Sequence, residues 1–335
     1  MKIAFETEQH ALAEGFDRAA AATSSPVTLR DLWTSESGRS PQLWAAVRDL
    51  GLPGILVPEE DGGHGGSLID LALVLERTGH HAVPDAVLEA CVTGPVAIAR
   101  GGTDEQRKRW LPSIADGDLR VTVALRGPAS VPDAHVSDLI VLREGGALVV
   151  VESSVCTLTP LASMDPSRRQ FAVEVPEGAA EPLDPSALDT VVAHEAAGSA
   201  SVLIGLARRM LDDTVAYVQV REQFGRLIGS FQAVKHQIAD ATARVTLAGF
   251  QVHAAAAKVA TGTDDALLSA LSARLVALDA EFESNRASLQ LHGGIGFTWE
   301  HDLQHWLKKG KALEQAHGGR GEIADEIGAA VLAGL

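Results

Sequence analysis

The sequence predicts a mainly helical protein with a small central β domain, and three observations support this fold class. Apolar residues recur at helical spacing through the first third of the chain, and long helical patterns return in the last part. Between them lie short, β-branched segments typical of strands. We therefore expect an N-terminal helical domain over residues 1–118, a reduced β domain over 119–182, and a C-terminal domain with a four-helix bundle over 183–335.

The N-terminal domain is predicted from amphipathic segments that glycine-rich loops separate. Apolar side chains at helical spacing mark helices around residues 5–16, 43–52 and 71–75. A further helix is expected to begin near Thr103, because a threonine cap there precedes acidic residues in the first turn. Pro112 is expected to disrupt this helix near its end.

The β domain is predicted from short segments that are rich in β-branched residues and bounded by Gly, Pro or Asp. The four expected strands cover residues 119–125, 138–142, 147–152 and 170–176. Residues 182–189 are expected to form a hinge into the second helical half of the chain.

Three long helices are expected in the C-terminal domain. The segment 190–220 is apolar almost all round, which predicts a central buried helix rather than a surface helix. The segment 231–261 is amphipathic and rich in alanine. The segment 265–291 begins with a plausible N-cap and ends at a run of glycines.

Charge and composition exclude several classes of function. The chain has 335 residues, 46% of them hydrophobic, and a formal net charge of −16. A chain with this much negative charge repels phosphate backbones and anionic lipids, so we expect neither nucleic-acid nor membrane binding. The two cysteines form no metal-binding or disulfide pattern, which favours a cytoplasmic protein. We expect no signal peptide and no apolar run of membrane-spanning length.

The segment REQFGRLIGSFQAVKHQIAD at 221–240 is the first candidate for a binding site. Arg221, Arg226 and Lys235 gather positive charge in an otherwise acidic chain, as a pyrophosphate requires. Gly225 and Gly229 allow a tight bend and a close approach of the backbone. On chemistry alone, an ordinary helix corner with a solvated basic rim explains the segment equally well.

This segment resembles the acyl-CoA dehydrogenase pattern R-x-x-F-G-x-x-[IL]-x-x-F-Q-x-x-x-H, and QLHGGIGFTWEHD at 290–302 resembles the second flavin segment of that family. The stretches at 43–66 and 101–125 also resemble the family, in the same order. The resemblance implies FAD held at a subunit interface. It implies that the ADP half of FAD faces Arg221, Phe224 and Gln232, and that the pyrophosphate or adenine side lies near Gln290, Gly293 and Gly294.

The resemblance also implies a reaction, the α,β-dehydrogenation of an acyl-CoA thioester by FAD. A carboxylate base removes the α-proton, and an electron-transfer flavoprotein is a suitable acceptor. At the position where most relatives carry this base, the chain has His317. A minority of relatives carry it earlier, and counting back from Arg221 gives Glu195. Glu314, Glu322 and His317 are the other candidates, and a subunit without a base is the remaining alternative.

The chain departs from the family pattern in its middle. Relatives carry a threonine that contacts the flavin after the first strand, and Arg126 replaces it within ALRGPASVPD. Some short members of the family pair with a different, complete subunit in an α2β2 assembly. The resemblance therefore implies either a homo-oligomer or a heterotetramer with a related subunit. The non-catalytic partner subunit and a scaffold redirected to another thioester reaction stay open as alternatives. The pair His301 and His305 is set aside as a metal site because it lacks a third ligand.

Overall fold

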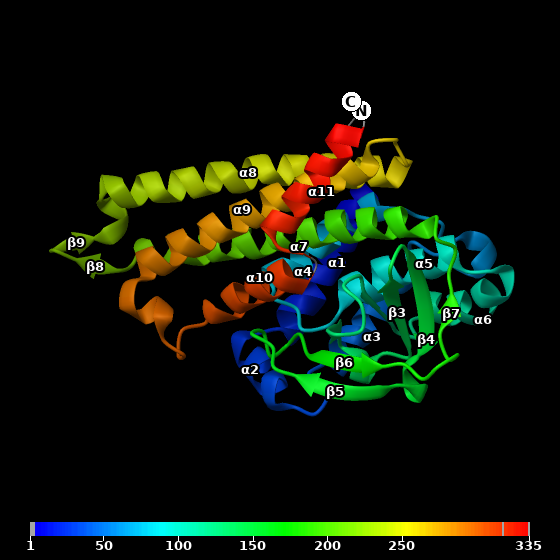
Figure 1. Ribbon diagram of the computed structural model, residues 1–335. Coiled ribbons are helices and arrows are strands. Elements are labelled where there is room, and N and C mark those ends of the chain that lie inside the picture. Colours follow the sequence, from blue (N-terminus) through cyan, green and yellow to red (C-terminus); the bar gives the residue numbers. More distant parts are fainter. Residues whose placement is uncertain (1–3, 317, 334–335) are drawn as a thin grey trace.

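The computed structural model describes residues 4–316 and 318–333, and it confirms the predicted fold class. Figure 1 shows long helices forming one layer, with the β domain below one end of them and the N-terminal helices between. The N-terminal helices are α1 (Thr7–Thr23), α2 (Pro26–Thr34), α3 (Pro41–Asp49), α4 (Leu68–His80), α5 (Gly94–Gly101) and α6 (Asp104–Ala115). Of these, α2 and α5 were not predicted. The boundaries of the three domains remain predictions.

Helix α6 begins where it was predicted but does not break at its proline. The side chain of Thr103 accepts a hydrogen bond from the backbone N–H of Gln106, which is the expected N-cap. Pro112 lies inside the helix, which continues to Ala115. The prediction that Pro112 disrupts the helix is therefore wrong, because the helix continues for about one turn after the proline. Its buried face extends to Ile114.

The β domain consists of two small sheets packed face to face. One sheet has the order β1 (Val121–Ala124), β3 (Leu139–Glu144), β4 (Ala147–Glu152) and β7 (Glu181–Pro182), with β1 and β3 parallel. The other has the order β2 (Val131–Pro132), β6 (Gln170–Glu174) and β5 (Thr157–Leu161). Apolar side chains from both sheets, including Ile140 and Phe171, form the core between them. The four predicted strands are all present, and β2, β5 and β7 were missed.

The C-terminal domain contains three long helices, α7 (Ala187–Val218), α8 (Gln232–Thr261) and α9 (Ala266–His292). A two-stranded hairpin, β8 (Glu222–Gln223) and β9 (Arg226–Leu227), joins α7 to α8 and projects from the far end of the bundle (Figure 1). Two shorter helices follow, α10 (Gln304–Ala316) and α11 (Arg320–Ala333). Within the part of the chain that the structure describes, the domain therefore combines the three predicted long helices with two shorter ones.

Helix α7 is the centre of the molecule, as its composition predicted. It packs against α4, α8 and α9, and most of its residues are buried. By length and composition α7 could cross a membrane, contrary to the expectation that no apolar run is long enough. However, 83% of its most apolar window is buried inside the protein, as in the core helix of a globular domain.

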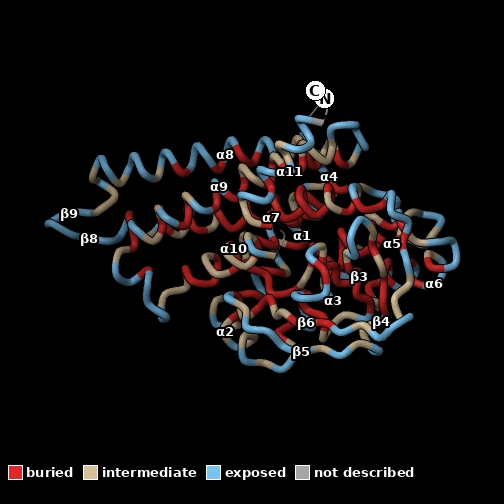
Figure 2. The backbone as a smooth tube through the Cα atoms, in the orientation of Figure 1, coloured by how far each residue is buried: buried red, intermediate tan, exposed pale blue. Residues whose placement is uncertain are grey.

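The first half of α8 and the hairpin before it are the most exposed parts of the helical layer (Figure 2). Phe224 at the hairpin tip is 91% exposed, and Leu247 and Phe250 on α8 are 69% and 64% exposed. Large apolar side chains gathered on one surface are typical of protein interfaces. The hairpin tip and the middle of α8 therefore carry the features of contact surfaces.

Candidate active site

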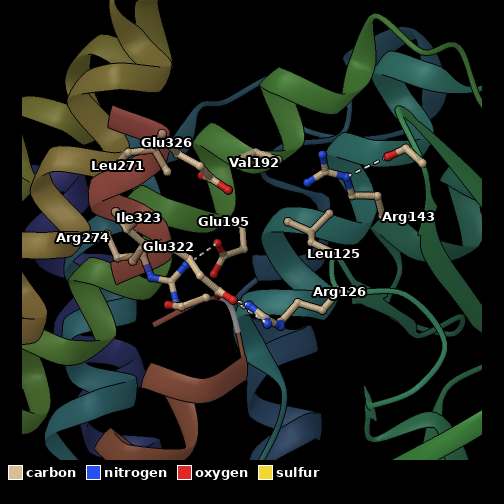
Figure 3. A pocket seen from close by; sticks show the side chains of 12 residues that line it. Leu125, Arg126, Arg143, Val192, Glu195, Leu271, Arg274, Glu322, Ile323 and Glu326 are labelled. Carbon is tan, nitrogen blue, oxygen red and sulfur yellow. Dashed lines mark hydrogen bonds and ion pairs between the residues drawn. The ribbon is translucent and has the colours of Figure 1, made fainter. Parts of the chain in front are cut away.

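A cavity of about 440 Å³ lies between the β domain and the helical bundle. Its wall combines residues at the end of β1, on the β3–β4 hairpin, and on α7, α9 and α11 (Figure 3). Charged side chains dominate this wall. They are Arg126, Arg143, Glu195, Arg274, Glu322 and Glu326. The cavity therefore brings three guanidinium groups and three carboxylates together.

Glu195 lies on α7 and forms a buried ion pair with Arg274 of α9. The distance from Nη1 of Arg274 to Oε2 of Glu195 is 3.2 Å, and both side chains are almost fully buried. Arg274 also donates to the backbone oxygens of Gly318, at 3.4 Å, and Leu313, at 3.5 Å. Burial lowers the pKa of Arg274, and the charge of Glu195 opposes that shift. Arg274 thus joins the candidate base to the segment that precedes α11.

A second, more exposed ion pair lies on the cavity wall. Both terminal nitrogens of the Arg126 guanidinium donate to the carboxylate of Glu322, Nη2 to Oε1 at 3.0 Å and Nη1 to Oε2. The hydrogen bonds to Glu322 raise the pKa of Arg126, and the same contact lowers the pKa of Glu322. Arg126 follows β1, so this pair ties the β domain to α11.

The candidate bases are not equally placed. Glu195 and Glu322 line the cavity, from α7 and α11. Glu314 does not line it and instead pairs with Lys311, with 2.7 Å between Nζ and Oε2. His317 lies outside the described residues. Glu195 therefore remains the candidate that combines burial with access to the cavity, and its role as a base remains a prediction.

The three residues expected to face the ADP half of FAD lie around the β8–β9 hairpin. Phe224 has φ of +54° and Gly225 has φ of +76°, which gives a two-residue turn between paired strands. Arg221 precedes the hairpin, Gln232 begins α8, and both are exposed. The guanidinium of Arg226 lies 3.9 Å from the centre of the Phe231 ring. This contact holds a positive charge near the tip of the hairpin.

Gln290, Gly293 and Gly294 lie where α9 ends, at the same end of the bundle as the hairpin (Figure 1). Gln290 and Gly294 are exposed. Gly293 has φ of +64°, and a Cβ atom added to Gly293 or Gly294 would meet nothing within 4 Å. Exposed glycine backbone beside open space allows close approach of a ligand. The structure thus brings the six predicted cofactor residues together at one end of the bundle. Their role in binding FAD remains a prediction.

Glu195 lies far from these six residues. It sits near the start of α7, whereas the hairpin follows Val218 at the end of the same helix. At about 1.5 Å per residue, this stretch of helix separates them by about 35 Å. The cavity around Glu195 and the end of the bundle are therefore two different sites on this chain.

Sequence reasoning missed three cavity residues, Arg143, Arg274 and Glu326. Arg274 gave one usable signal, because it stands among the mostly small and apolar residues LSARLVALDA at 271–280. The helix that carries them, α9, packs against both α7 and α8. A buried arginine requires a buried acid. No comparable signal marks Arg143 or Glu326, because both stand among other polar residues at a turn or on an exposed helix.

Two family profiles match this chain. That described as "Acyl-CoA dehydrogenase, N-terminal domain" matches residues 6–118, and that described as "Acyl-CoA dehydrogenase, C-terminal domain" matches residues 186–333. Among curated proteins, acyl-CoA dehydrogenase IpdE2 of Mycolicibacterium smegmatis is 35% identical over 88% of this chain and 89% of its own length. IpdE2 of Mycobacterium tuberculosis is 34% identical over 92% of each chain.

Solved structures give the same result for the fold. A variant of the Tcur3481–Tcur3483 steroid ACAD superimposes with a TM-score of 0.90 at 26% identity, covering 98% of each chain. The ChsE4–ChsE5 complex from Mycobacterium tuberculosis gives 0.87 at 24% identity, covering 99% of each chain. Butyryl-CoA dehydrogenase from Megasphaera elsdenii gives 0.85 at 18% identity, covering 99% of this chain and all of that one.

Proposed function

The chain belongs to the acyl-CoA dehydrogenase family, and from this premise we propose that it works as one subunit of a flavin-dependent acyl-CoA dehydrogenase. In this proposal it lends the end of its bundle to the dinucleotide half of an FAD that a related subunit holds. When bound, FAD supplies the two-electron oxidation of the Cα–Cβ bond of the thioester.

The observation that carries the proposal is the separation of the two sites on this chain. The six residues around the hairpin and the end of α9 lie about 35 Å from the cavity, measured along α7. They are therefore too distant to serve a flavin ring in the cavity of the same chain. A neighbouring subunit whose cavity meets this end of the bundle would use them instead.

The end of the bundle fits the dinucleotide chemically. Arg221, Arg226 and Lys235 supply positive charge for phosphate oxygens, and all three are exposed. Gly293 and Gly294 leave open space above their backbone. The exposed Phe224 at the hairpin tip also suits a subunit interface there, and the exposed Leu247 and Phe250 in the middle of α8 would extend it along the helix.

The chain's own cavity does not fit a flavin ring. Among the described residues that line it, none carries a hydroxyl group or an aromatic ring, and the guanidinium groups of Arg126 and Arg143 lie at the β-domain side. Arg126 also pairs with Glu322 on this wall. A flat, partly apolar ring would have to displace these charges. In this proposal, therefore, no flavin step takes place in this cavity.

The relatives' names support an assembly of this kind. One similar structure is titled a Tcur3481–Tcur3483 steroid ACAD and another a ChsE4–ChsE5 complex, and each title names two components. By analogy with these two structures, we propose that this chain pairs with a related, longer subunit. The word steroid in the first title suggests that the substrate of the assembly is an acyl-CoA with a bulky ring system. An electron-transfer flavoprotein is the acceptor that we expect for the assembly.

A second candidate is a subunit that also performs the chemistry, with Glu195 as the base. The position of Glu195 on the cavity wall favours it. In that case Glu195 would accept the α-proton at a carboxylate oxygen while Arg274 holds the side chain in place. Glu195→Gln would then retain bound flavin and abolish its reduction by acyl-CoA, whereas flavin reduction at the parent rate would exclude this role.

The test of the first proposal is the flavin content of the chain alone and with a full-length related subunit. We expect little or no FAD in the chain purified alone and about one FAD per pair after co-expression, measured by absorbance. Arg221→Gln should lower the FAD content of the pair. Arg109→Gln is the matched control, because Arg109 is a surface arginine that pairs with Glu181 in the chain.

Two results would contradict the proposal. Stoichiometric FAD in the chain expressed alone would show that no other subunit is needed. Equal FAD content in the Arg221→Gln and Arg109→Gln pairs would show that the end of the bundle does not bind the cofactor.

A further inference from the structure

Helix α11 (Arg320–Ala333) presents two carboxylates to the cavity from one of its faces. Glu322 and Glu326 are four residues apart, so they project from the same side of the helix. Figure 3 shows both carboxylates directed from α11 toward the arginine side chains. Glu322 binds Arg126, and Glu326 acts electrostatically on Arg126 and Arg274. The helix thus offers carboxylate groups to the arginines, as an anionic ligand would.

The three arginines come from three other elements, so the fold rather than one local motif brings them together. Arg126 follows β1, Arg143 lies on β3, and Arg274 lies on α9. Nε of Arg143 donates to the backbone oxygen of Gly145 at 3.1 Å, and Arg143 makes no ion pair with a carboxylate in residues 4–316 and 318–333. A guanidinium that faces a cavity in this way is suited to bind carboxylate or phosphate.

The Arg126–Glu322 pair is the exposed part of the contact between α11 and the rest of the chain, since Ile323 lies in the core and Arg320 pairs with Asp279 at 3.0 Å. Ile323 is buried, but the side chains of Arg126 and Glu322 are 46% and 56% exposed. A pair this exposed contributes little net stability, because water solvates both charges well. Gly318, just before the helix, has φ of +95°, and Gly319 is surrounded by open space on its Cβ side. Glu322 can therefore separate from Arg126 at small cost.

We propose that the cavity is an anion-binding site in which Glu322 is a built-in competitor. A ligand that carries a carboxylate or a phosphate group binds Arg126 and Arg143, displaces Glu322 and loosens α11. This site is separate from the end of the bundle to which the dinucleotide was assigned. Its test needs neither flavin nor a partner subunit, so its failure is distinguishable from a failure of the proposed function.

The experiment uses the purified full-length chain and two probes, inorganic phosphate and succinate, at constant ionic strength with chloride as reference. Binding is measured by isothermal titration and by the shift in the thermal midpoint. Glu322→Gln removes the competitor, and Arg143→Gln removes a binding group. The matched control is Glu181→Gln, which removes one carboxylate from the Arg109–Glu181 pair, whose side chains are 42% and 44% exposed.

Glu322→Gln should bind the preferred anion about two- to fivefold more tightly than the parent, as expected for loss of an exposed pair. Glu181→Gln should bind like the parent, and Arg143→Gln should bind at least about fivefold more weakly. Tighter binding of phosphate or of succinate identifies which group the site prefers. Equal affinities of Glu322→Gln and Glu181→Gln, unchanged affinity of Arg143→Gln, or no binding of either anion would overturn the proposal.

Cleavage by trypsin after Arg320 tests the movement of α11 directly. Arg320 is anchored by its Nη2, which donates to the backbone oxygen of Leu278 at 2.9 Å. The preferred anion should accelerate this cleavage in the parent chain, because the helix loosens when Glu322 is displaced. Slower cleavage in the presence of a bound anion would show that α11 closes over the ligand, which contradicts the competition.

Discussion

Arg274 and Glu195 form a buried ion pair that joins α9 to α7 at the cavity wall, with 3.2 Å between Nη1 and Oε2. The two side chains are only 2% and 4% exposed. Desolvating two charges costs a large part of what their attraction returns, so such a pair adds little net stability by itself. Its main effect is to hold Glu195 in one orientation toward the cavity.

Removing one member of this pair should be much more costly than removing both. Arg274→Met leaves the carboxylate of Glu195 buried without its present counter-charge, and we expect a loss of about 3–5 kcal/mol in the free energy of unfolding. Glu195→Leu combined with Arg274→Met should recover most of that loss. Urea unfolding of the two single variants and the double variant measures the coupling. Losses that simply add would show that the pair is not coupled.

The glycines at the end of α9 allow binding to be separated from folding. Gly294→Ala should leave the free energy of unfolding within about 0.5 kcal/mol of the parent, because the new Cβ meets nothing within 4 Å. If FAD approaches this backbone, the same variant should lower the FAD content of the assembled pair. Gly293→Ala should in addition destabilise the chain by about 1–3 kcal/mol, because φ there is +64°.

The two measurements are the denaturant midpoint and the flavin absorbance of the purified pair. Gly328→Ala on α11 is the control, since its Cβ also meets open space but lies away from the end of the bundle. Parent-like FAD content in Gly294→Ala would exclude a close approach of the cofactor to this glycine.

Local patterns predicted the elements whose composition matches their secondary structure. Helix α7 was predicted because its apolar residues surround the whole helix, and β4 was predicted with its observed limits because β-branched residues fill it. Strand β5 was missed because its residues are mostly exposed and include Pro160, so they carry no strand pattern. Pro112 was misread because tertiary packing outweighed a local breaker.

The candidate site was predictable only where one residue carried its own signal. Glu195 was found by its position before a recognisable motif, and the hairpin was found by its charge and glycines. Arg143 and Arg274 were missed because the cavity forms only where β3 and α9 meet other elements. Such a site depends on packing between elements distant in sequence, which no local pattern encodes.

Glu281 should make stability depend on pH between about 4.5 and 7. This carboxyl is 2% exposed, and burial raises its pKa to about 7, although Lys311 opposes the shift. The folded chain therefore binds this proton more tightly than the unfolded chain. Its contribution to stability is fully present below pH 4.5 and is lost as pH rises through 7, by up to about 3 kcal/mol.

Urea unfolding of Glu281→Gln at pH 5, 6, 7 and 8 tests this dependence. The variant should lack the slope that Glu281 contributes and should be more stable than the parent at pH 8. Glu283→Gln on the same helix is the matched control and should keep the parent's slope, because Glu283 pairs with Arg286 at the surface. An unchanged slope in Glu281→Gln would assign the pH dependence to other groups.

The crossing of α4 and α7 depends on two glycines. A Cβ added to Gly79 would overlap the backbone oxygen of Val202, and one added to Gly205 would overlap the backbone oxygen of Glu76. Backbone atoms in packed helices cannot move aside as a flexible side chain can. Gly79→Ala and Gly205→Ala should therefore each lose about 2–4 kcal/mol, or fail to fold. Gly328→Ala should instead gain up to about 1 kcal/mol, since alanine favours an open helix position. The thermal midpoint and the soluble yield are measured for all three variants. Parent-like stability of Gly79→Ala or Gly205→Ala would mean that the two helices do not pack this closely.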